Sequence, residues 1–438
     1  MNFYFGVSHI MIKRFSLYGF LKNQKYYEPF ILLAFLQMGL SYTLIGFLIA
    51  FREFMVNLME IPSGAIADVW GRRRSMILSF FAYIIHFALI GFAGTFAVNG
   101  RIPYPLLLVF LFVSMVFFAV GDAFRTGTHK AMIFTWLRLQ GRIDSKTEVY
   151  GYTRSWSQVG SAVSVLIACS FVYFSNSYVQ IFYFSIIPYV LNIINFTTYP
   201  KELDGDVKDT VNFNRIMTHI KESFVVIFRR KSLRRLILES MGYEGFFKSI
   251  KDYLQPILQQ ASLPVITLLF AGLAMSREQQ SVILIGPVYF LLYMLSAGAS
   301  KQAHKLVNKI GSEDASARVL WLGMFLLMIL LIPGMFLNIY WLMIAGFIAY
   351  YVIQNLWTPV FISRLDAHSS ESQGATVMSI QSQSKSIATM VIAPITGLAV
   401  DFIKVKEIGL SEFWPLAVFG AIISGLFLIG TRNSSKEI

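Results

Sequence analysis

Long apolar segments separated by short polar loops dominate the chain. Most of the apolar segments are about 17–25 residues long, the length that crosses ~30 Å of hydrocarbon as an α-helix. The predicted spans are 26–41, 44–67, 75–97, 103–126, 149–173, 178–199, 236–259, 282–300, 318–336, 339–362, 374–400 and 413–431. The pattern therefore predicts an all-α membrane protein with twelve transmembrane helices.

The longest hydrophilic stretch, residues 200–235, divides the predicted spans into two sets of six. After Pro200 it begins KELDGDVKD and it ends FRRKSLRR, with an amphipathic piece between these charged runs. We therefore expect a six-helix bundle over 1–199, a cytoplasmic connector with an amphipathic helix over 200–235, and a second six-helix bundle over 236–438.

Composition and charge agree with a membrane protein. The chain is 56% hydrophobic and 14% charged, whereas a soluble chain carries about 25% charged residues. A net charge of +13 is compatible with a nucleic-acid partner, but the basic residues follow the positive-inside rule. Nine lie in 200–235, while the predicted outside segments carry only Arg101, Arg277, Lys404 and Lys406. This distribution predicts two cytoplasmic termini and no nucleic-acid partner.

Three segments need separate interpretation. Residues 263–274 are apolar but too short to cross, so we expect a re-entrant or surface-lying piece, or part of a misplaced span. Met1–Lys25 is aromatic and basic without a small-residue cleavage site, which indicates a retained cytoplasmic segment. The single cysteine, Cys169, provides neither a disulfide framework nor a cysteine metal cluster. Compact loops and the absence of a cleaved signal favour a bacterial inner membrane.

The loop after the second span contains a spaced motif of Gly64, Asp68, Gly71, Arg72 and Arg73. A glycine at position 71 permits a tight turn, and the following arginines suit anionic cytoplasmic headgroups. This spacing resembles the signature loop of the major facilitator superfamily, although Val69 stands where that family often has a basic residue.

The resemblance implies two six-helix bundles that alternate access to a central site. It also implies that Gly64, Asp68, Gly71 and Arg72, with Arg73 beside them, help to latch the cytoplasmic side. Arg125, near the cytoplasmic end of the fourth span, is a candidate partner for Asp68 or Asp122 at this inner gate, or it reaches the interface by snorkelling, as Arg154 does.

Four basic residues, Arg52, Lys248, Lys251 and Lys385, fall near the middle of predicted spans. A charge there costs at least ~2.5–3.5 kcal/mol on insertion scales and normally faces a partner or a watery cavity. We therefore expect these four side chains to point away from lipid.

The seventh span carries the densest polar stripe. With about 100° per residue, Ser240, Glu244, Lys248, Lys251 and Gln255 share one face, and Asp252 lies at its edge. One interpretation is an ion-pair ladder of Glu244–Lys248 and Lys248–Asp252 that holds helices together. The other is a charged lining of the transport pathway, which the family resemblance also favours.

Polar positions in other spans extend this lining toward the midplane, where secondary transporters bind substrate. A pocket of both signs with a slight cationic excess suits a small polar, anionic or zwitterionic organic solute. Glu53, Glu60 and Glu244 are candidate proton-coupling residues. The predicted substrate-binding residues are Arg52, Glu244, Lys248, Lys251, Asp252, Gln354, Asn355, Gln381 and Lys385.

These features predict a secondary active transporter coupled to a proton or another ion gradient. The alternative is a proton-coupled multidrug efflux antiporter, which Phe117 disfavours because many such antiporters carry arginine at that position. A membrane enzyme or a receptor is a further alternative, but no nucleophile–base or metal constellation supports an enzyme. We expect no cofactor, because the chain has no glycine-rich phosphate loop, no metal, and a monomer in the bilayer.

Overall fold

A computed structural model describes residues 2–126, 128–142, 145–204, 231–269, 274–367, 374–406 and 411–434. Within these ranges all regular secondary structure is helical. The chain divides into two compact units. The first unit contains Met1–Gly39 and Phe54–Phe213, and the second contains Leu40–Glu53 and Asn214–Ile438.

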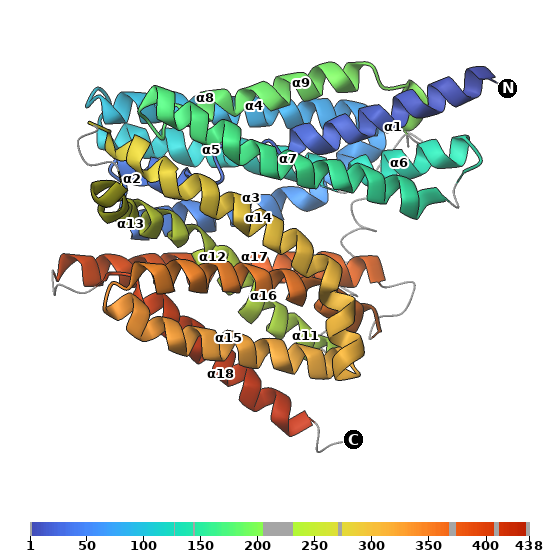
Figure 1. Cartoon of the computed structure of the whole chain (residues 1–438). Helices are drawn as coiled ribbons and strands as arrows, with labels where there is room; N and C mark the ends of the chain where they lie inside the picture. The colour runs from blue at the N-terminus through green and yellow to red at the C-terminus, as the bar shows by residue number, and fades with distance from the viewer. Residues whose placement is uncertain are drawn as a thin grey trace. The chain divides into compact units, whose positions relative to one another are not determined.

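In the first unit, helices α1, α4, α7 and α9 lie side by side (Figure 1). Helix α1 packs against α7 and α9, and α4 packs against α5, α8 and α9. The helices are α1 (Asn2–Lys22), α2 (Ile31–Gln37), α4 (Arg72–Val98), α5 (Tyr104–Arg125), α6 (Thr128–Leu139), α7 (Lys146–Ser175), α8 (Ile181–Phe184), α9 (Ile186–Thr197) and a 3-10 turn, η2 (Lys201–Asp204).

In the second unit, α15 packs against α16 and α18, while α14 packs against α13 and α16. Its core contains a ring cluster in which Tyr243 stacks on Trp357 and Trp321 stacks on Phe427. The elements are α11 (Lys231–Ser240), a π-helical turn η3 (Met241–Gly245), α12 (Phe246–Ile250), a 3-10 turn η4 (Lys251–Tyr253), α13 (Leu254–Leu269), α14 (Arg277–Ile310), α15 (Glu313–Phe336), α16 (Tyr340–Ala367), α17 (Gly374–Val405) and α18 (Trp414–Ser434).

Helix α3 (Tyr42–Trp70) is continuous but belongs to both units, with the change at Glu53. Its first residues group with the second unit because Asp401 of α17 accepts hydrogen bonds from the backbone nitrogens of Tyr42 and Thr43, at 3.1 and 2.7 Å. The contact units therefore differ from the predicted halves in the segment Leu40–Glu53, and the division at 200–235 stays a prediction. The connector residues 205–230 lie outside the described part of the chain.

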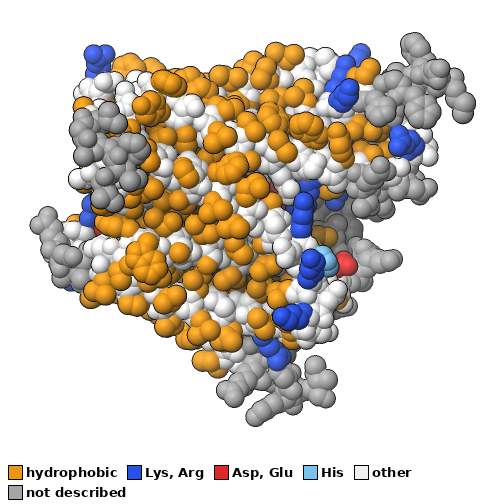
Figure 2. All heavy atoms as spheres, viewed as in Figure 1, with side chains coloured by type: hydrophobic (Ala, Val, Ile, Leu, Met, Phe, Trp, Pro, Cys, Tyr) orange, Lys and Arg blue, Asp and Glu red, His pale blue; other side chains and the backbone are white. Residues whose placement is uncertain are grey.

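Eight helices within the described ranges are long and apolar enough to cross a membrane. Two shorter apolar helices, Ile181–Thr197 and Trp414–Ile429, accompany them. Figure 2 shows hydrophobic side chains over most of the visible surface of each unit, with Lys and Arg side chains mainly toward the edges. Leucines such as Leu166, Leu398 and Leu426 are exposed on the surface, as expected where the surroundings are lipid hydrocarbon and not water. The chain is therefore an all-helical integral membrane protein.

The first predicted span, 26–41, is wrong in its bounds. Helix α1 ends at Lys22 and α2 begins at Ile31, with turns between them. Pro29 cannot donate a helical hydrogen bond and restricts the residue before it. The preceding segment Met1–Lys25, predicted as a retained cytoplasmic segment, consists largely of helix α1, whose Phe15 and Tyr18 are buried in the first unit.

Of the two interpretations of 263–274, a separate re-entrant or surface-lying piece is wrong where the structure describes it, and part of a misplaced span is confirmed there. Leu263–Leu269 continues helix α13, and residues 270–273 lie outside the described ranges. The run from Lys231 to Leu269 is therefore longer than the predicted seventh span, and two turns of unusual geometry interrupt it.

Candidate functional sites

The seventh helical run does not present the single polar face that a regular helix predicts. The π turn at Met241–Gly245 and the 3-10 turn at Lys251–Tyr253 change its residues per turn twice. The predicted ladder of Glu244–Lys248 and Lys248–Asp252 is therefore wrong. Each of these side chains pairs elsewhere, in three small clusters.

The first cluster centres on the buried carboxylate of Glu53 in α3. The Lys248 Nζ lies 2.5 Å from Glu53 Oε2, and the Arg52 guanidinium lies 3.0 Å from Oε1. Two cations therefore share one carboxylate, and the sequence-predicted residues Arg52, Glu53 and Lys248 lie together.

The second cluster surrounds Glu244 in the π turn. The Gln381 Nε2 of α17 donates to Glu244 Oε2 at 2.8 Å and to the Ser240 hydroxyl at 2.7 Å. The Lys385 Nζ lies 3.5 Å from the same Glu244 oxygen. Glu244, Gln381 and Lys385 therefore lie together. The lysine that pairs with Glu244 is farther from its carboxylate, at 3.5 Å, than Lys248 and Arg52 are from the Glu53 carboxylate, at 2.5 and 3.0 Å.

The third pair joins neighbours in the 3-10 turn, where Lys251 Nζ lies 2.7 Å from Asp252 Oδ1. The other predicted polar residues lie in α16. The Gln354 Nε2 donates to the Thr358 hydroxyl at 3.4 Å, and the Asn355 side chain donates to the Tyr351 carbonyl. The Gln354 Oε1 is buried without a hydrogen-bond partner among the described residues.

Burial differs between the two signs of charge in these clusters. The side chains of Glu53 and Glu244 are 3% and 8% exposed, whereas those of Lys248 and Lys385 are each 32% exposed. The carboxylates are therefore buried behind the lysines. A molecule that approaches these clusters meets positive charge first, although each cluster contains an acid.

The predicted gate motif forms contacts inside the first unit. Gly71 begins α4 with φ of 89°, a conformation that favours glycine. The backbone nitrogen of Arg73 donates to Asp204 Oδ1 at 2.7 Å, and its guanidinium donates to the Tyr199 carbonyl at 3.1 Å. Arg72 donates to the Thr135 hydroxyl at 2.8 Å. These contacts hold the start of α4 against α6 and the end of the first unit.

Other motif residues are only partly described. Gly64 and Asp68 lie in α3, but their side chains are outside the described part of the chain. Glu60 is in the α3 segment of the first unit, where its carbonyl accepts a hydrogen bond from Ser63. Of the two partners predicted for Arg125, Asp122 is confirmed, at 2.5 Å.

A buried network at one end of the second unit was missed from the sequence. Arg364 of α16 donates to Glu239 at 2.7 Å and to Asp314 at 2.8 Å, and Arg235 also donates to Glu239, at 3.0 Å. Opposite charges near the same predicted end of spans seven and ten were the available signal.

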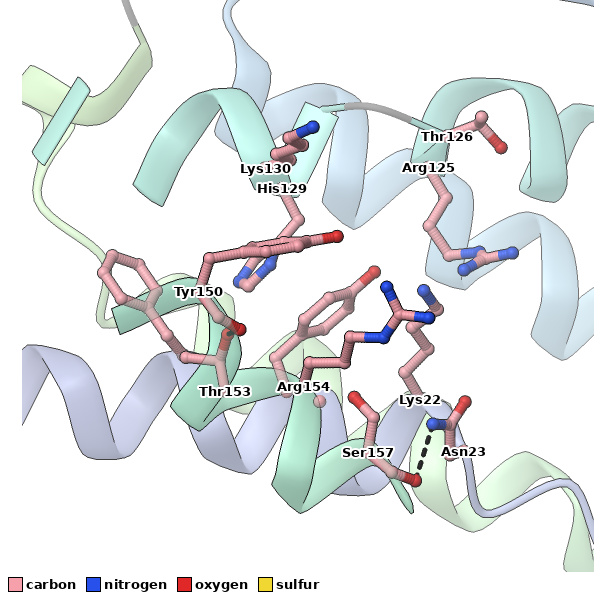
Figure 3. A pocket seen from close by; sticks show the side chains of 13 residues that line it. Lys22, Asn23, Arg125, Thr126, His129, Lys130, Tyr150, Thr153, Arg154 and Ser157 are labelled. Carbon is pink, nitrogen blue, oxygen red and sulfur yellow. Dashed lines mark hydrogen bonds between the residues drawn. The ribbon is translucent and has the colours of Figure 1, made fainter. Parts of the chain in front are cut away.

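The first unit contains a polar pocket that was also missed. It has a volume of about 450 Å³ and is lined by residues from α1, α5, α6 and α7 and the turns that follow α1 and α5. Figure 3 shows the charged ends of Lys22, Arg125 and Arg154 pointing toward one another. Lys22 lies outside the predicted spans, and Arg154 lies near the cytoplasmic end of its span, where snorkelling is the ordinary expectation for an arginine.

Comparison with known proteins defines the class. The family model described as "Major Facilitator Superfamily" matches residues 23–394. The chain therefore belongs to the major facilitator superfamily, as its motif indicated, and it is a secondary transporter and not an enzyme.

A curated relative and several solved structures are similar to this chain. It is 23% identical over 236 residues to the "Uncharacterized MFS-type transporter YxaM" of Bacillus subtilis (strain 168), which covers 53% of this chain and 54% of YxaM. The match thus spans about half the length of that relative.

The solved structures share the fold across nearly the whole chain. A mutant of nucleoside transporter NupG has a TM-score of 0.75 with 13% identity, covering 96% of this chain and 99% of NupG. A POT family transporter in complex with 5-aminolevulinic acid has a TM-score of 0.65 with 15% identity, covering 96% of each chain. A D-xylose–proton symporter has a TM-score of 0.66 with 13% identity, covering 96% of this chain and 97% of the symporter.

Proposed function

We propose that this protein is a secondary active transporter that moves a small polar, anionic or zwitterionic organic solute by alternating access, driven by a proton gradient. The proposal includes two six-helix halves, cytoplasmic termini and a bacterial inner membrane. The positive-inside distribution of basic residues supports the orientation, and the bacterial relative supports the location.

The observation that carries the substrate class is the unequal burial of charges in the second unit. Lys248 and Lys385 are partly exposed, while the carboxylates of Glu53 and Glu244 are nearly buried behind them. A lipophilic cation would be repelled by these lysines, whereas a carboxylate or phosphate would form charge-assisted hydrogen bonds with them. The unpaired Gln354 Oε1 supplies an acceptor for the ammonium or hydroxyl group of a zwitterion or a polar solute.

Glu244 is the proposed proton carrier. Glu53 contacts two cations at 2.5 and 3.0 Å, so binding a proton there would disrupt two ion pairs. Glu244 has one lysine at 3.5 Å and otherwise contacts a neutral amide. Proton uptake at Glu244 therefore disturbs fewer charge contacts and leaves Lys385 available for the solute.

Transport into proteoliposomes with an imposed proton gradient tests this function. We expect labelled amino acids or organic acids to accumulate, and Lys248→Ala and Lys385→Ala to reduce their uptake at least tenfold. Lys309→Ala is the matched control, because Lys309 is an exposed lysine at the end of α14, and it should transport normally.

The opposite result would assign the multidrug antiporter function instead. In that case tetraphenylphosphonium or ethidium would be transported, organic anions and zwitterions would not, and the two lysine variants would behave like wild type. Glu244→Gln separates coupling from binding: it should abolish gradient-driven uptake but preserve exchange of solute across the membrane.

A further inference from the structure

The pocket of the first unit is built by a close crossing of α1 and α7. A Cβ atom at Gly160 would lie 2.5 Å from the Phe20 carbonyl oxygen, and one at Gly19 would lie 2.8 Å from the Ser157 hydroxyl. At this crossing the Asn23 side chain donates to the Ser157 carbonyl at 2.7 Å. The end of α1 is therefore fixed against α7, which places Lys22 beside Arg154.

Arg125, one of the three basic residues that converge in the pocket, already forms an ion pair with an aspartate. The Arg125 guanidinium lies 2.5 Å from Asp122 Oδ1, and its Nε donates to the Tyr83 hydroxyl at 3.3 Å. These contacts offset the charge of Arg125 and fix its orientation. Asp122 does not line the pocket, and among the described residues that line it there is no aspartate or glutamate.

Lys22 and Arg154 are the basic side chains that face Arg125 across the pocket. Within the described part of the chain neither side chain forms an ion pair, and Figure 3 shows both directed toward Arg125. Lys130 points away from them in Figure 3, and its Nζ lies 5.5 Å from the Tyr150 ring centroid. Two basic side chains and a held guanidinium therefore face one small volume. Burial, together with the nearby Arg125, lowers the pKa of Lys22 to about 7, so an anion bound in the pocket would favour the protonated amine.

We propose that this pocket binds a small organic dianion, such as a dicarboxylate or a phosphate monoester, with Lys22, Arg125 and Arg154 as its charge partners. The proposal rests on the transport function above and narrows its solute to a doubly charged anion. Three basic side chains against one described acid, Asp122, suit a ligand with two negative charges, and guanidinium groups match carboxylate and phosphate geometry in bidentate fashion.

The size and surroundings of the pocket agree with an organic ligand. A volume of about 450 Å³ falls within the ~300–1,000 Å³ of small-molecule sites and exceeds the need of a single inorganic ion. The Tyr150 ring and the polar side chains of Asn23 and Ser157 line the rest of the pocket. They offer hydrogen bonds and an apolar face to the carbon skeleton between two anionic groups.

Calorimetric titration of the full-length protein in neutral detergent tests the site. The probes are succinate and methyl phosphate, with succinamide as the uncharged match to succinate. We expect both dianions to bind and succinamide not to bind. Lys22→Gln and Arg154→Gln should each weaken succinate binding at least tenfold, whereas Lys13→Gln, an exposed lysine on the same helix α1, should bind like wild type.

The conservative variant Lys22→Arg keeps the charge and should retain most of the affinity, which separates loss of charge from misfolding. Equal succinate affinity in wild type, Lys22→Gln and Arg154→Gln would overturn the proposal. Binding of succinamide as tight as that of succinate would overturn it as well.

A lipid headgroup carries the same phosphate chemistry, so the titration is repeated in nanodiscs. Equal succinate affinity in phosphatidylcholine and phosphatidylglycerol discs supports a soluble dianion. Loss of succinate binding in phosphatidylglycerol discs alone would assign the pocket to lipid and overturn the proposal.

Transport measurements distinguish this inference from the proposed function. If proteoliposomes accumulate a zwitterion and Arg154→Gln leaves that uptake unchanged, the pocket inference fails while the transport function stands. If succinate binds in the manner expected but no organic anion or zwitterion is transported, the site stands and the proposed function fails.

Discussion

The buried Glu239–Arg364 pair of the second unit gives the sharpest stability prediction. Glu239 is 0% exposed and Arg364 is 5% exposed, and their charged atoms lie 2.7 Å apart. Replacing Glu239 with Gln keeps the shape but leaves the Arg364 guanidinium without its buried counter-charge. Removing one partner of a buried ion pair costs about 3–5 kcal/mol.

The expected cost lies at the lower end of that range, about 3 kcal/mol, because Arg364 keeps Asp314 at 2.8 Å and that carboxylate is 60% exposed. At about 2–4 °C per kcal/mol for a unit of this size, Tm should fall by about 6–12 °C. Thermal unfolding in detergent micelles measures this shift. Glu202→Gln, at an exposed position of the first unit, should leave Tm unchanged.

The double variant Glu239→Gln with Arg364→Met is the decisive member of the series. It removes the unpaired charge together with its partner, so its Tm should lie well above the value expected from adding the two single losses. Additive losses within about 0.5 kcal/mol would show that the two side chains do not interact, and the pairing described here would be refuted.

Three further predictions concern other contacts. Glu244→Gln should remove the pH dependence of solute uptake measured in proteoliposomes, and persistence of gradient-driven uptake would contradict its role as proton carrier. Asp401→Ala should lower the free energy of unfolding by about 0.5–2 kcal/mol, the usual worth of a helix N-cap, because Asp401 accepts hydrogen bonds from Tyr42 and Thr43; an unchanged unfolding midpoint would argue against this cap. Gly160→Val should cost about 1–3 kcal/mol through overpacking and weaken succinate binding, and unaltered titration and Tm would show that the α1–α7 crossing yields easily.

Hydrophobic length predicted the helices well because the bilayer imposes a simple rule on apolar segments. The predicted bounds failed where helix formation depends on something other than hydrophobic length. Helix α1 is aromatic and basic, and hydropathy alone does not mark it as a buried helix. Its burial comes from packing against α7 and α9, and the local sequence does not reveal these long-range contacts. Pro29 was visible in the sequence, yet a hydropathy average conceals a break of a few residues.

The sequence also identified Glu53 and Glu244, two buried carboxylates of the second unit, but not their partners, and it missed the buried Glu239–Arg364 pair. Lys248 contacts Glu53, which is far away in the chain, in preference to Glu244 four residues before it. Pairing depends on helix phase, and the π turn changes that phase. The first-unit pocket was missed because one of its basic residues, Lys22, lies in a helix that falls outside the predicted spans.

The π turn at Met241–Gly245 has a mechanical consequence for the seventh helical run. It accommodates one extra residue, so the segments before and after it are rotated by about 100° relative to a uniform α-helix. This offset lets one continuous rod direct Glu239 toward Arg364 and Lys248 toward Glu53. Conversion of the π turn to regular α-helical hydrogen bonding would rotate α11 relative to α12 about the helix axis. The ion pairs of Glu239 and Lys248, one on each side of the π turn, would oppose that rotation.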